Sequence, residues 1–222
     1  MEYYNNRIKV FDSSGAYIRS FGGYGSRCNQ WRYSRQFAIY NDKIYLADTY
    51  GHRIKVLNLN GGCVWNNGAR YNYPHEIAVE SSYVYVGHNN SYISHYTTNG
   101  VHQTGYYNAG SNLSYSWGMS LNSSGNKLAI GDYSKNRVVE FTVSGQSLSY
   151  NQATSTSYST SNGYFRRPVD AGYDSSGNIY ALDLYGHRIQ KFNSSLVYQT
   201  KTGGYSTSSG FRYPYGTHVD SS

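Results

Sequence analysis

The amino-acid sequence predicts an all-β fold, and three observations carry this prediction: the composition, short alternating strands and an internal repeat. The 222 residues include 28 Tyr and 24 Gly but only 3 Pro, and only 14% of them are charged. Tyr, Val, Ile, Ser, Asn and Gly suit strands and turns, whereas long amphipathic helices need Leu, Ala, Glu and Lys. Residues 175–192, SSGNIYALDLYGHRIQKF, show the unit: a turn, an alternating strand, a loop that begins at Asp183 and a second alternating strand.

The same unit recurs along the chain. NDKIYLADTYGHRIKVLN covers residues 41–58, and SSGNKLAIGDYSKNRVVEF covers residues 123–141. The apolar anchor of the second strand returns after about 45 residues on average, which is the spacing of four-stranded propeller blades. The anchors are Ile8, Ile54, Ile93, Val138 and Ile189. A single sheet of this kind cannot bury both faces, so we expect the blades to stack side by side in a β-propeller.

We expect each blade to be an antiparallel meander of four strands, named a to d from the inside outward. The a strands are expected at residues 37–40, 76–79, 118–121, 170–173 and 217–220. The b strands contain Ile44, Val84, Leu128 and Ile179 and end at Asp48, His88, Asp132 and Asp183. The c strands contain the anchors, and d strands follow them, as at residues 16–21 and 196–200.

This assignment gives five a, c and d strands but only four b strands. Glu2 is in register with Asp48, just past a b strand, and Ser222 stands just before one. We therefore expect one domain of five blades over residues 1–222, whose termini meet in a composite blade that lacks a strand. The expected repeats are 1–34 with 211–222, 35–73, 74–115, 116–167 and 168–210. A six-bladed parent that lost a repeat is one alternative, and a partner chain or self-association that completes the blade is another.

Short motifs return with the repeat. Residues 6–8 (NRI) are followed by 11–15 (FDSSG) and 21–25 (FGGYG), while 48–54 and 183–189 share Asp and Gly-His-Arg-Ile, and 211–216 read FRYPYG. These motifs resemble the NHL-repeat family of β-propellers over nearly the whole chain. The resemblance is weakest between about residues 75 and 107, where His88 replaces the Asp and Tyr92 the Arg.

Charge and cysteine content restrict the partners. The formal net charge is +7, which permits an anionic partner such as RNA or acidic glycan without requiring one. No run of about 18 apolar residues occurs, so we expect no membrane insertion. Cys28 and Cys63 lack the Cys-x-x-Cys spacing of metal sites; they can form a disulfide, which we favour, or stay two thiols. Possible N-glycosylation sites of a secreted protein stand at Asn89, Asn112, Asn122 and Asn193.

The candidate binding site follows from the register, because the b–c and d–a loops of a propeller gather on one face. The starts of the a strands, which ring the channel mouth, differ between blades and place Arg35, His75, Trp117, Val169 and Tyr215 at one position. We expect Arg35, His75, Trp117 and Tyr215 to bind a ligand, with Trp117 as a flat stacking surface. The d–a loops add a basic rim that can pair with phosphate or carboxylate, formed by Arg70, Arg166, Arg167 and Arg212.

The Gly-His-Arg triplet resembles a catalytic or ligand-binding motif. It recurs at residues 51–53 and 186–188, however, so we expect it to brace the blades. Amidating lyases that resemble NHL propellers bind zinc through Pro-His motifs, and only His75 matches one. Lactonase-type propellers need acids in the channel ring, and the aligned position has none. We therefore expect no catalytic residue, metal or cofactor.

The sequence favours a non-catalytic binding or scaffolding propeller, extracellular or on the cell surface, that engages protein or glycan through the channel-mouth face. Two alternatives stay open. One is a cytoplasmic RNA-binding module that uses the basic, Tyr-rich rim. The other is a metal-dependent lyase or lactonase-type propeller.

Overall fold

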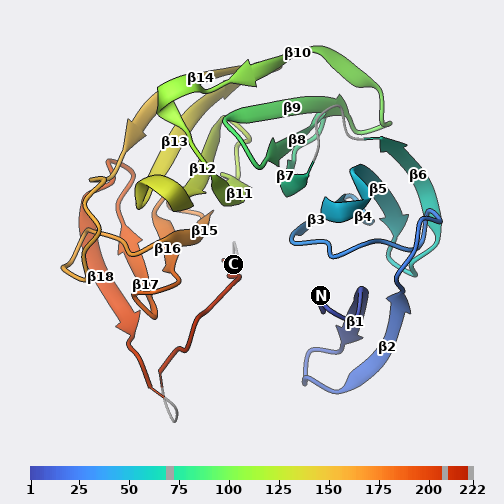
Figure 1. The fold of residues 1–222 in the computed structure, drawn as a ribbon, viewed down its shortest axis with the longest axis horizontal. Coiled ribbons are helices and arrows are strands. Elements are labelled where there is room, and N and C mark those ends of the chain that lie inside the picture. The colour runs from blue at the N-terminus through green and yellow to red at the C-terminus, as the bar shows by residue number, and fades with distance from the viewer. Residues whose placement is uncertain (69–72, 207–209, 220–222) are drawn as a thin grey trace. The chain divides into compact units, whose positions relative to one another are not determined.

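The computed structural model of the chain is all-β and describes residues 1–68, 73–206 and 210–219 (Figure 1). Its strands form five antiparallel sheets, four with four strands and one with two. These sheets are the blades of the predicted β-propeller, so the predicted fold class is confirmed.

The strands of each sheet are neighbours in sequence, as expected for a meander. The two-stranded sheet contains β1 (Arg7–Phe11) and β2 (Tyr17–Gly22). The next two sheets contain β3 (Phe37–Tyr40), β4 (Lys43–Asp48), β5 (Arg53–Asn58) and β6 (Cys63–Gly68), then β7 (Pro74–Val79), β8 (Tyr83–His88), β9 (Tyr92–Thr97) and β10 (His102–Asn108). The last two contain β11 (Ser116–Leu121), β12 (Lys127–Asp132), β13 (Arg137–Ser144) and β14 (Ser147–Ala153), then β15 (Pro168–Tyr173), β16 (Ile179–Asp183), β17 (Arg188–Phe192) and β18 (Tyr198–Gly203).

Asp and Asn side chains close the hairpin turns between c and d strands. Asp12 Oδ1 accepts the backbone N–H groups of Ser14 and Ala16, both at 2.9 Å. Asn193 Oδ1 accepts those of Ser195 and Val197 at 3.0 and 2.9 Å. Such side chains imitate a backbone turn, which explains why an Asp or Asn recurs at the end of the c strand. The helical segments are the 3-10 turns η1 (Thr49–Gly51), η2 (Gly110–Asn112) and η3 (Tyr133–Lys135).

The incomplete blade differs in one respect from the expectation. The sequence predicts that residues 217–220 form its a strand, but residues 217–219 have no regular secondary structure, and residue 220 lies outside the described residues. A strand is stabilised by a ladder to a neighbour, and among the described residues no b strand pairs with this segment. The blade therefore consists of β1 and β2 alone.

The chain divides into two compact units, Met1–His88 with Ser94–Thr104 and Asn89–Ile93 with Gly105–Ser222. In the first unit, successive residues of β4 face opposite sides of their sheet, as the period of a strand requires. Ile44 and Leu46 pack with Ile8 and the fully buried Trp31. Tyr45 and Ala47 face the other core, packing with Ile54, Val56, Ile77, Val84, Val86 and Tyr96.

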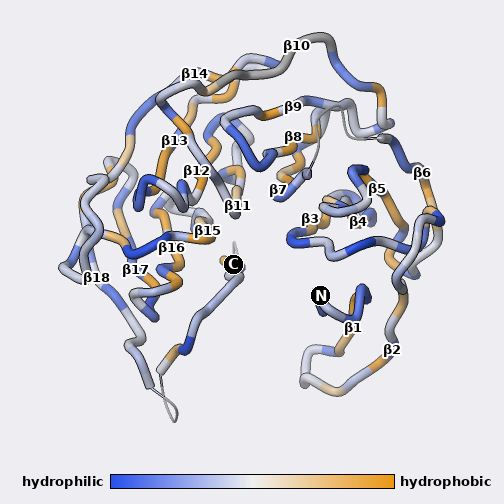
Figure 2. Tube along the Cα trace, in the orientation of Figure 1, coloured by the Kyte–Doolittle hydropathy of each residue, from blue (hydrophilic) through white to orange (hydrophobic). Residues whose placement is uncertain are grey.

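The core of the second unit lies between the sheets β11–β14 and β15–β18. It contains Ala129, Val138, Phe165, Ala171, Tyr173, Ile179, Ala181 and Phe192. Figure 2 shows hydrophobic residues along middle strands such as β12 and β13, whereas the outer strand β18 is mainly hydrophilic. Burial of one Val, Leu, Ile or Phe side chain contributes about 1.5–3 kcal/mol, so the middle strands hold each blade together. No helix of the described residues is long and apolar enough to cross a membrane.

Candidate functional site

Two b–c loops are held by buried aspartates at the end of the b strands. Asp48 Oδ1 accepts the backbone N–H of Arg32 at 2.7 Å, and Asp183 Oδ1 accepts that of Arg166 at the same distance. Burial raises the pKa of both carboxyls, against these hydrogen bonds and the cationic neighbours that lower it. Each aspartate therefore joins its b strand to the preceding d–a loop.

The histidine of the Gly-His-Arg triplet makes the next link between loops. His52 Nδ1 accepts the backbone N–H of Tyr73 at 3.1 Å, and His187 Nδ1 accepts that of Tyr213 at 3.2 Å. Both Tyr residues have a left-handed backbone, with φ of 55° and 51°, and the one at Tyr73 turns the chain into the a strand β7. Each His is thus a connector between adjacent loops.

The arginine of the triplet completes the brace. Arg188 Nε lies 3.1 Å from Asp183 Oδ2, and its Nη atoms donate to the backbone carbonyls of Thr160, Ser161 and Tyr164. Only 4% of its side chain is exposed, so it is unavailable to a ligand. Gly-His-Arg is a structural feature of the repeat, as the sequence indicates.

An aromatic cluster lies where loops and a strands meet in the second unit. Trp117 stacks on Tyr133, with ring centroids 4.6 Å apart and an interplanar angle of 20°. It also stacks on Tyr215, at 6.0 Å and 25°. Tyr115 meets Trp117 and Tyr133 edge-on. Tyr215 is 67% exposed as a residue, so this stack offers a flat apolar surface to solvent.

A cation and a phenol stand at one end of this stack. The Arg167 guanidinium lies over the Tyr133 ring, 4.8 Å from its centroid, and Nη1 donates to the carbonyls of Tyr133 and Ser134 at 3.1 and 3.3 Å. Burial raises the pKa of the Tyr133 phenol, and a hydrogen bond with Tyr185 raises it further, although Arg167 acts in the opposite direction. Tyr133 therefore stays protonated at neutral pH and can donate a proton.

A buried acid, Asp170, follows Val169, which belongs to the core cluster against which Trp117 and Tyr133 pack. Asp170 is 7% exposed; its Oδ1 accepts the N–H of Ala171 at 3.0 Å, and its Oδ2 accepts that of Thr217 at 2.9 Å. Burial raises the pKa of Asp170 to about 7. The sequence alignment of the ring misses this residue because it stands one position further along the strand, where the other blades carry Gln36, Glu76, Gly118 and Gly216.

The repeat assigns Asp170 a structural role. Gln36, at the same position of the β3 sheet, uses its Oε1 to accept the N–H of Ile77 at 2.9 Å. Asp170 makes the equivalent contact to Thr217, which holds the C-terminal segment beside β15. A neutral amide and an acid thus accept the same backbone hydrogen bond, so the position of Asp170 is explained without a catalytic role.

The four residues of the predicted ligand site are divided between the two compact units. Trp117 and Tyr215 stack on each other in the second unit. Arg35 and His75 belong to the first unit, where His75 is only 3% exposed. Trp117 and Tyr215 could be predicted from the sequence because they stand at a position where the repeats carry different residues. The sequence gives no signal for the contact of Arg167 with Tyr133.

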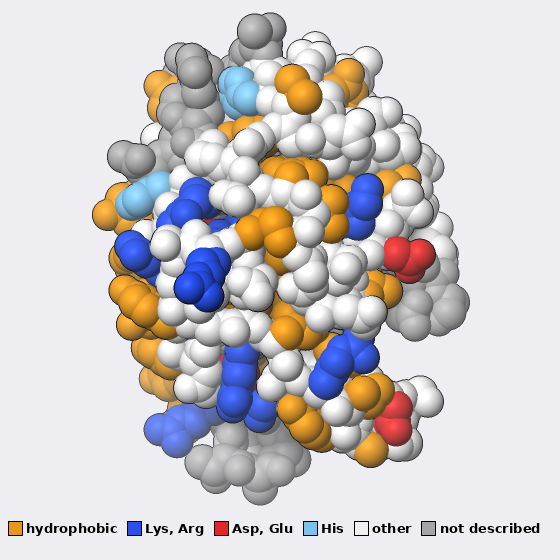
Figure 3. All heavy atoms as spheres, turned by 90° about the vertical axis from the view of Figure 1, so that its right-hand side faces the viewer, with side chains coloured by type: hydrophobic (Ala, Val, Ile, Leu, Met, Phe, Trp, Pro, Cys, Tyr) orange, Lys and Arg blue, Asp and Glu red, His pale blue; other side chains and the backbone are white. Residues whose placement is uncertain are grey.

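The predicted basic rim is partly occupied by contacts within the protein. Arg166 lies over the Tyr158 ring at 4.9 Å, as Arg32 does over Tyr24 at 5.6 Å. Arg212 is exposed, and Arg70 lies outside the described residues. Figure 3 shows Lys and Arg spread over one face of the molecule, with fewer Asp and Glu side chains there. Binding of RNA to this rim stays a prediction of the sequence.

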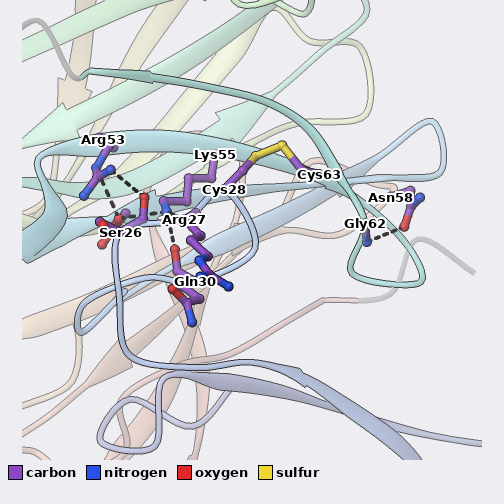
Figure 4. The surroundings of a disulfide bond; sticks show 10 residues. Ser26, Arg27, Cys28, Gln30, Arg53, Lys55, Asn58, Gly62 and Cys63 are labelled. Carbon is purple, nitrogen blue, oxygen red and sulfur yellow. Dashed lines mark hydrogen bonds and ion pairs between the residues drawn. A yellow bond between two sulfur atoms is a disulfide. The ribbon is translucent and has the colours of Figure 1, made fainter.

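Cys28 and Cys63 form a disulfide that ties the loop after β2 to the start of β6 (Figure 4). Lys55, which is fully buried, supports the same loop by donating to the carbonyls of Arg27 and Gln30. Two of the predicted glycosylation sites, Asn122 and Asn193, use their side-chain oxygens to close turns. Asn112 lies in η2, and Asn89 is exposed.

Neither a protein-family model nor a curated protein sequence matches the chain. Solved structures do match it. A structure of streptogramin B lyase is 16% identical, with a TM-score of 0.67, over 91% of this chain and 63% of its own. A catalytically inactive variant of virginiamycin B lyase from Staphylococcus aureus with quinupristin is 14% identical, with a TM-score of 0.65, over 90% and 64%. A functionally unknown protein from Desulfotomaculum acetoxidans is 12% identical, with a TM-score of 0.68, over 92% and 65%.

The chain shares its fold with lyase propellers. Identities of 12 to 16% show the fold alone, and the chain spans 63 to 65% of the length of these structures. The propeller is thus supported by structure as well as by sequence, while the likeness to NHL repeats in particular stays a prediction.

This similarity corrects the function that the sequence favours. A non-catalytic binding or scaffolding module is expected from the absence of catalytic motifs, yet two of the solved structures that share this fold are structures of lyases. The expectation is wrong because a propeller assembles a site from single residues of several blades. Such a site leaves no contiguous motif in the sequence.

Among the described residues, no three His, Cys, Asp or Glu side chains lie together as a metal-binding group. Those residues do not fit a zinc site with three protein ligands, which is the site that an amidating lyase of the metal-dependent alternative requires.

Proposed function

We propose that this chain is the propeller of a lyase that acts on a substrate with a planar aromatic group. The fold similarity to streptogramin B lyase and virginiamycin B lyase carries this proposal. The aromatic stack of Trp117, Tyr133 and Tyr215 supports it, because a flat, partly exposed surface of this kind binds planar rings.

A lyase breaks a bond by elimination. A base removes a proton from carbon, the electron pair of that C–H bond forms a double bond to the neighbouring carbon, and the leaving group departs with its own bonding pair. The leaving group then takes up a proton, so no water is added. Such a reaction needs a base, a binding surface, a group that stabilises negative charge and an acid.

The cluster in the second unit supplies the last three of these. The Trp117 and Tyr215 rings hold the planar part of the substrate. The Arg167 guanidinium is permanently charged and lies within 4.8 Å of the Tyr133 ring centroid, so it stabilises negative charge that develops there. Tyr133 is protonated at neutral pH, as a phenol ordinarily is, and it donates the proton to the leaving group. We assign no residue to the base.

Incubation with quinupristin followed by mass spectrometry tests the reaction. Elimination conserves the total mass of the substrate, either as separate products or, where the broken bond lies in a ring, as one ring-opened isomer that differs in chromatographic retention and fragmentation, whereas hydrolysis adds the mass of one water. We expect the first result. Products that carry an added water contradict the lyase proposal, and so does complete recovery of unchanged quinupristin at high protein concentration.

Variants test the assigned residues. Tyr133→Phe keeps the stacked ring and removes the proton donor, so kcat should fall by a factor of roughly 100 or more. Trp117→Ala should raise KM by up to about tenfold, since a stacked aromatic pair contributes ~0.5–1.5 kcal/mol. Trp117→Phe should restore much of that loss. Tyr150→Phe, on the outer strand β14, is the matched control and should leave both constants unchanged. Unaltered kcat in Tyr133→Phe contradicts the role of the phenol.

A further inference from the structure

The two-stranded blade exposes one backbone edge of β1. β1 pairs with β2 on one side, from Arg7 opposite Gly22 to Phe11 opposite Tyr17. On its other side, Glu2 N donates to Arg7 O at 2.8 Å and Arg7 N donates to Glu2 O at 3.4 Å. Within residues 1–68, 73–206 and 210–219, no strand pairs with the rest of this edge.

The bridge between Glu2 and Arg7 is the first rung of a ladder that is complete in other blades. Its counterparts are the pairs Asp48 with Arg53, Asp132 with Arg137 and Asp183 with Arg188. From Asp48, the b strand β4 continues through five more pairs, down to Lys43 opposite Asn58. The incomplete blade therefore has the start of a b–c ladder without its b strand.

Burial shows the effect of the missing strand. The residues at the Phe11 position in the other four c strands are buried, at 0 to 1% exposure: Leu57, Tyr96, Phe141 and Phe192. Phe11 itself is 51% exposed. Where the ladder is described, the residue opposite this position is a buried aliphatic one: Ile44, Leu128 or Ile179.

The direction of the backbone groups identifies which residues can accept a strand. Because Arg7 turns its N–H and C=O toward Glu2, the two-residue period of a strand turns those of Lys9 and Phe11 the same way. Ile8 and Val10 face β2 instead. An edge with free hydrogen-bonding groups and an exposed apolar side chain is a template for strand addition.

We propose that β1 binds an extended strand donated by a separate polypeptide, antiparallel to β1 and in line with Glu2, with Ile or Leu opposite Phe11. The donated strand would complete the ladder as β4 does in its own blade. A second copy of β1 fits this edge poorly. The register that pairs all of β1 with itself sets Lys9 opposite Lys9, and it requires the place beside Arg7 that Glu2 occupies.

A peptide of residues 41–47 (NDKIYLA), the chain's own b-strand sequence up to the position that Glu2 takes, is the direct probe. Labelled peptide should bind saturably in a fluorescence anisotropy titration and raise the midpoint of thermal unfolding. Lys9→Pro removes the N–H that faces the open edge and leaves the ladder to β2 intact, so it should weaken binding at least about tenfold. Lys9→Ala, which keeps that N–H, should bind like the wild type.

Modified peptides test the hydrogen bonds at Lys9 without changing the protein. The residue that corresponds to Leu46 lies opposite Lys9 and must donate its N–H to it, so N-methylation there should abolish binding. N-methylation at the neighbouring Tyr45 position, whose N–H points away from β1, should be tolerated. Equal binding of both peptides, or no binding of the unmodified one, overturns the proposal. Dimerisation of the chain that Lys9→Pro abolishes also overturns it, because the occupant is then a second copy.

Discussion

Asp170 illustrates at the scale of one residue how a buried acid can serve structure. Its two oxygens accept the N–H groups of Ala171 and Thr217, and a Cβ on Gly118 would lie only 2.5 Å from Oδ1, so its surroundings are close-packed. Since Gln36 makes the equivalent bond to Ile77 with a neutral amide, the contact needs an acceptor and not a charge. A charge at this site is costly because it is out of reach of water.

This cost predicts a pH-dependent stability. The pKa of Asp170 is about 7 in the folded protein and has its ordinary value of 3.8 in the unfolded chain. Between these values the unfolded chain releases a proton that the folded protein keeps, so stability falls as pH rises from 3.8 to 7 and is level above 7. The free energy of unfolding should drop by about 3 kcal/mol between pH 5 and pH 8 on account of this group.

Asp170→Asn should remove that part of the pH dependence, because Asn does not titrate and its oxygen can still accept the N–H of Thr217. Urea denaturation at pH 5 and pH 8 measures the difference. Asp12→Asn, at an exposed turn, is the control. It should keep the pH dependence of the free energy of unfolding that Asp170 gives the wild type. If the free energy of unfolding changes equally between pH 5 and pH 8 in Asp170→Asn and in the wild type, Asp170 is charged in the folded state.

At the scale of the element, the b–c loop depends on a close approach between a glycine and the brace aspartate. A Cβ on Gly186 would lie 2.0 Å from Asp183 Oδ2, and one on Gly51 would lie 2.1 Å from Asp48 Oδ2. In the loop η3, Lys135 takes the place of the glycine, and Asp132 Oδ2 still pairs with Arg137 at 3.2 Å. The glycine is thus found in the two loops whose aspartate also accepts a backbone N–H from the preceding d–a loop.

Gly186→Ala should therefore push the Asp183 carboxylate off the Arg166 N–H. We expect a loss of about 1–3 kcal/mol in the free energy of unfolding, the usual cost of an unmade bond to a charged group. Gly68→Ala, where a Cβ meets nothing within 4 Å, is the matched control and should be neutral. Chemical denaturation of the two variants gives the comparison, and equal stability would contradict the proposed crowding.

The strands themselves follow from sequence because a period of two and a recurring anchor are local properties. The predicted a strand at 37–40 agrees with β3, and the b strand that ends at Asp48 agrees with β4. The strand predicted at 217–220 fails because strand formation depends on a partner, which is not a local property. In the same way, Trp117 and Tyr215 could be found from their register, but the contact of Arg167 with Tyr133 depends on the left-handed backbone at Arg167, with φ of 69°.

At the scale of the whole molecule, the two compact units differ in covalent support. The disulfide between Cys28 and Cys63 lies in the first unit, and among the described residues no cysteine is free. It joins residues 35 positions apart, and Lys55 and Arg53 hold the same loop through the carbonyls of Ser26, Arg27 and Gln30. Because these bonds keep the folded loop in place, the disulfide acts mainly by restricting the unfolded chain.

Replacing both cysteines, Cys28→Ser with Cys63→Ser, should lower the free energy of unfolding of the first unit by about 4 kcal/mol, the value expected for a closed loop of this length. Reduction of the wild type should have the same effect and should leave the double variant unchanged, which controls for other actions of the reductant. Hydrogen exchange followed by mass spectrometry can locate the change. Slowly exchanging amides of β4 and β5 should exchange faster, while those of β16 and β17 keep their rates. Faster exchange in β16 and β17 as well would show that the disulfide stabilises the chain as one cooperative body. Loss of the constraint in the first unit would then lower the free energy of opening everywhere.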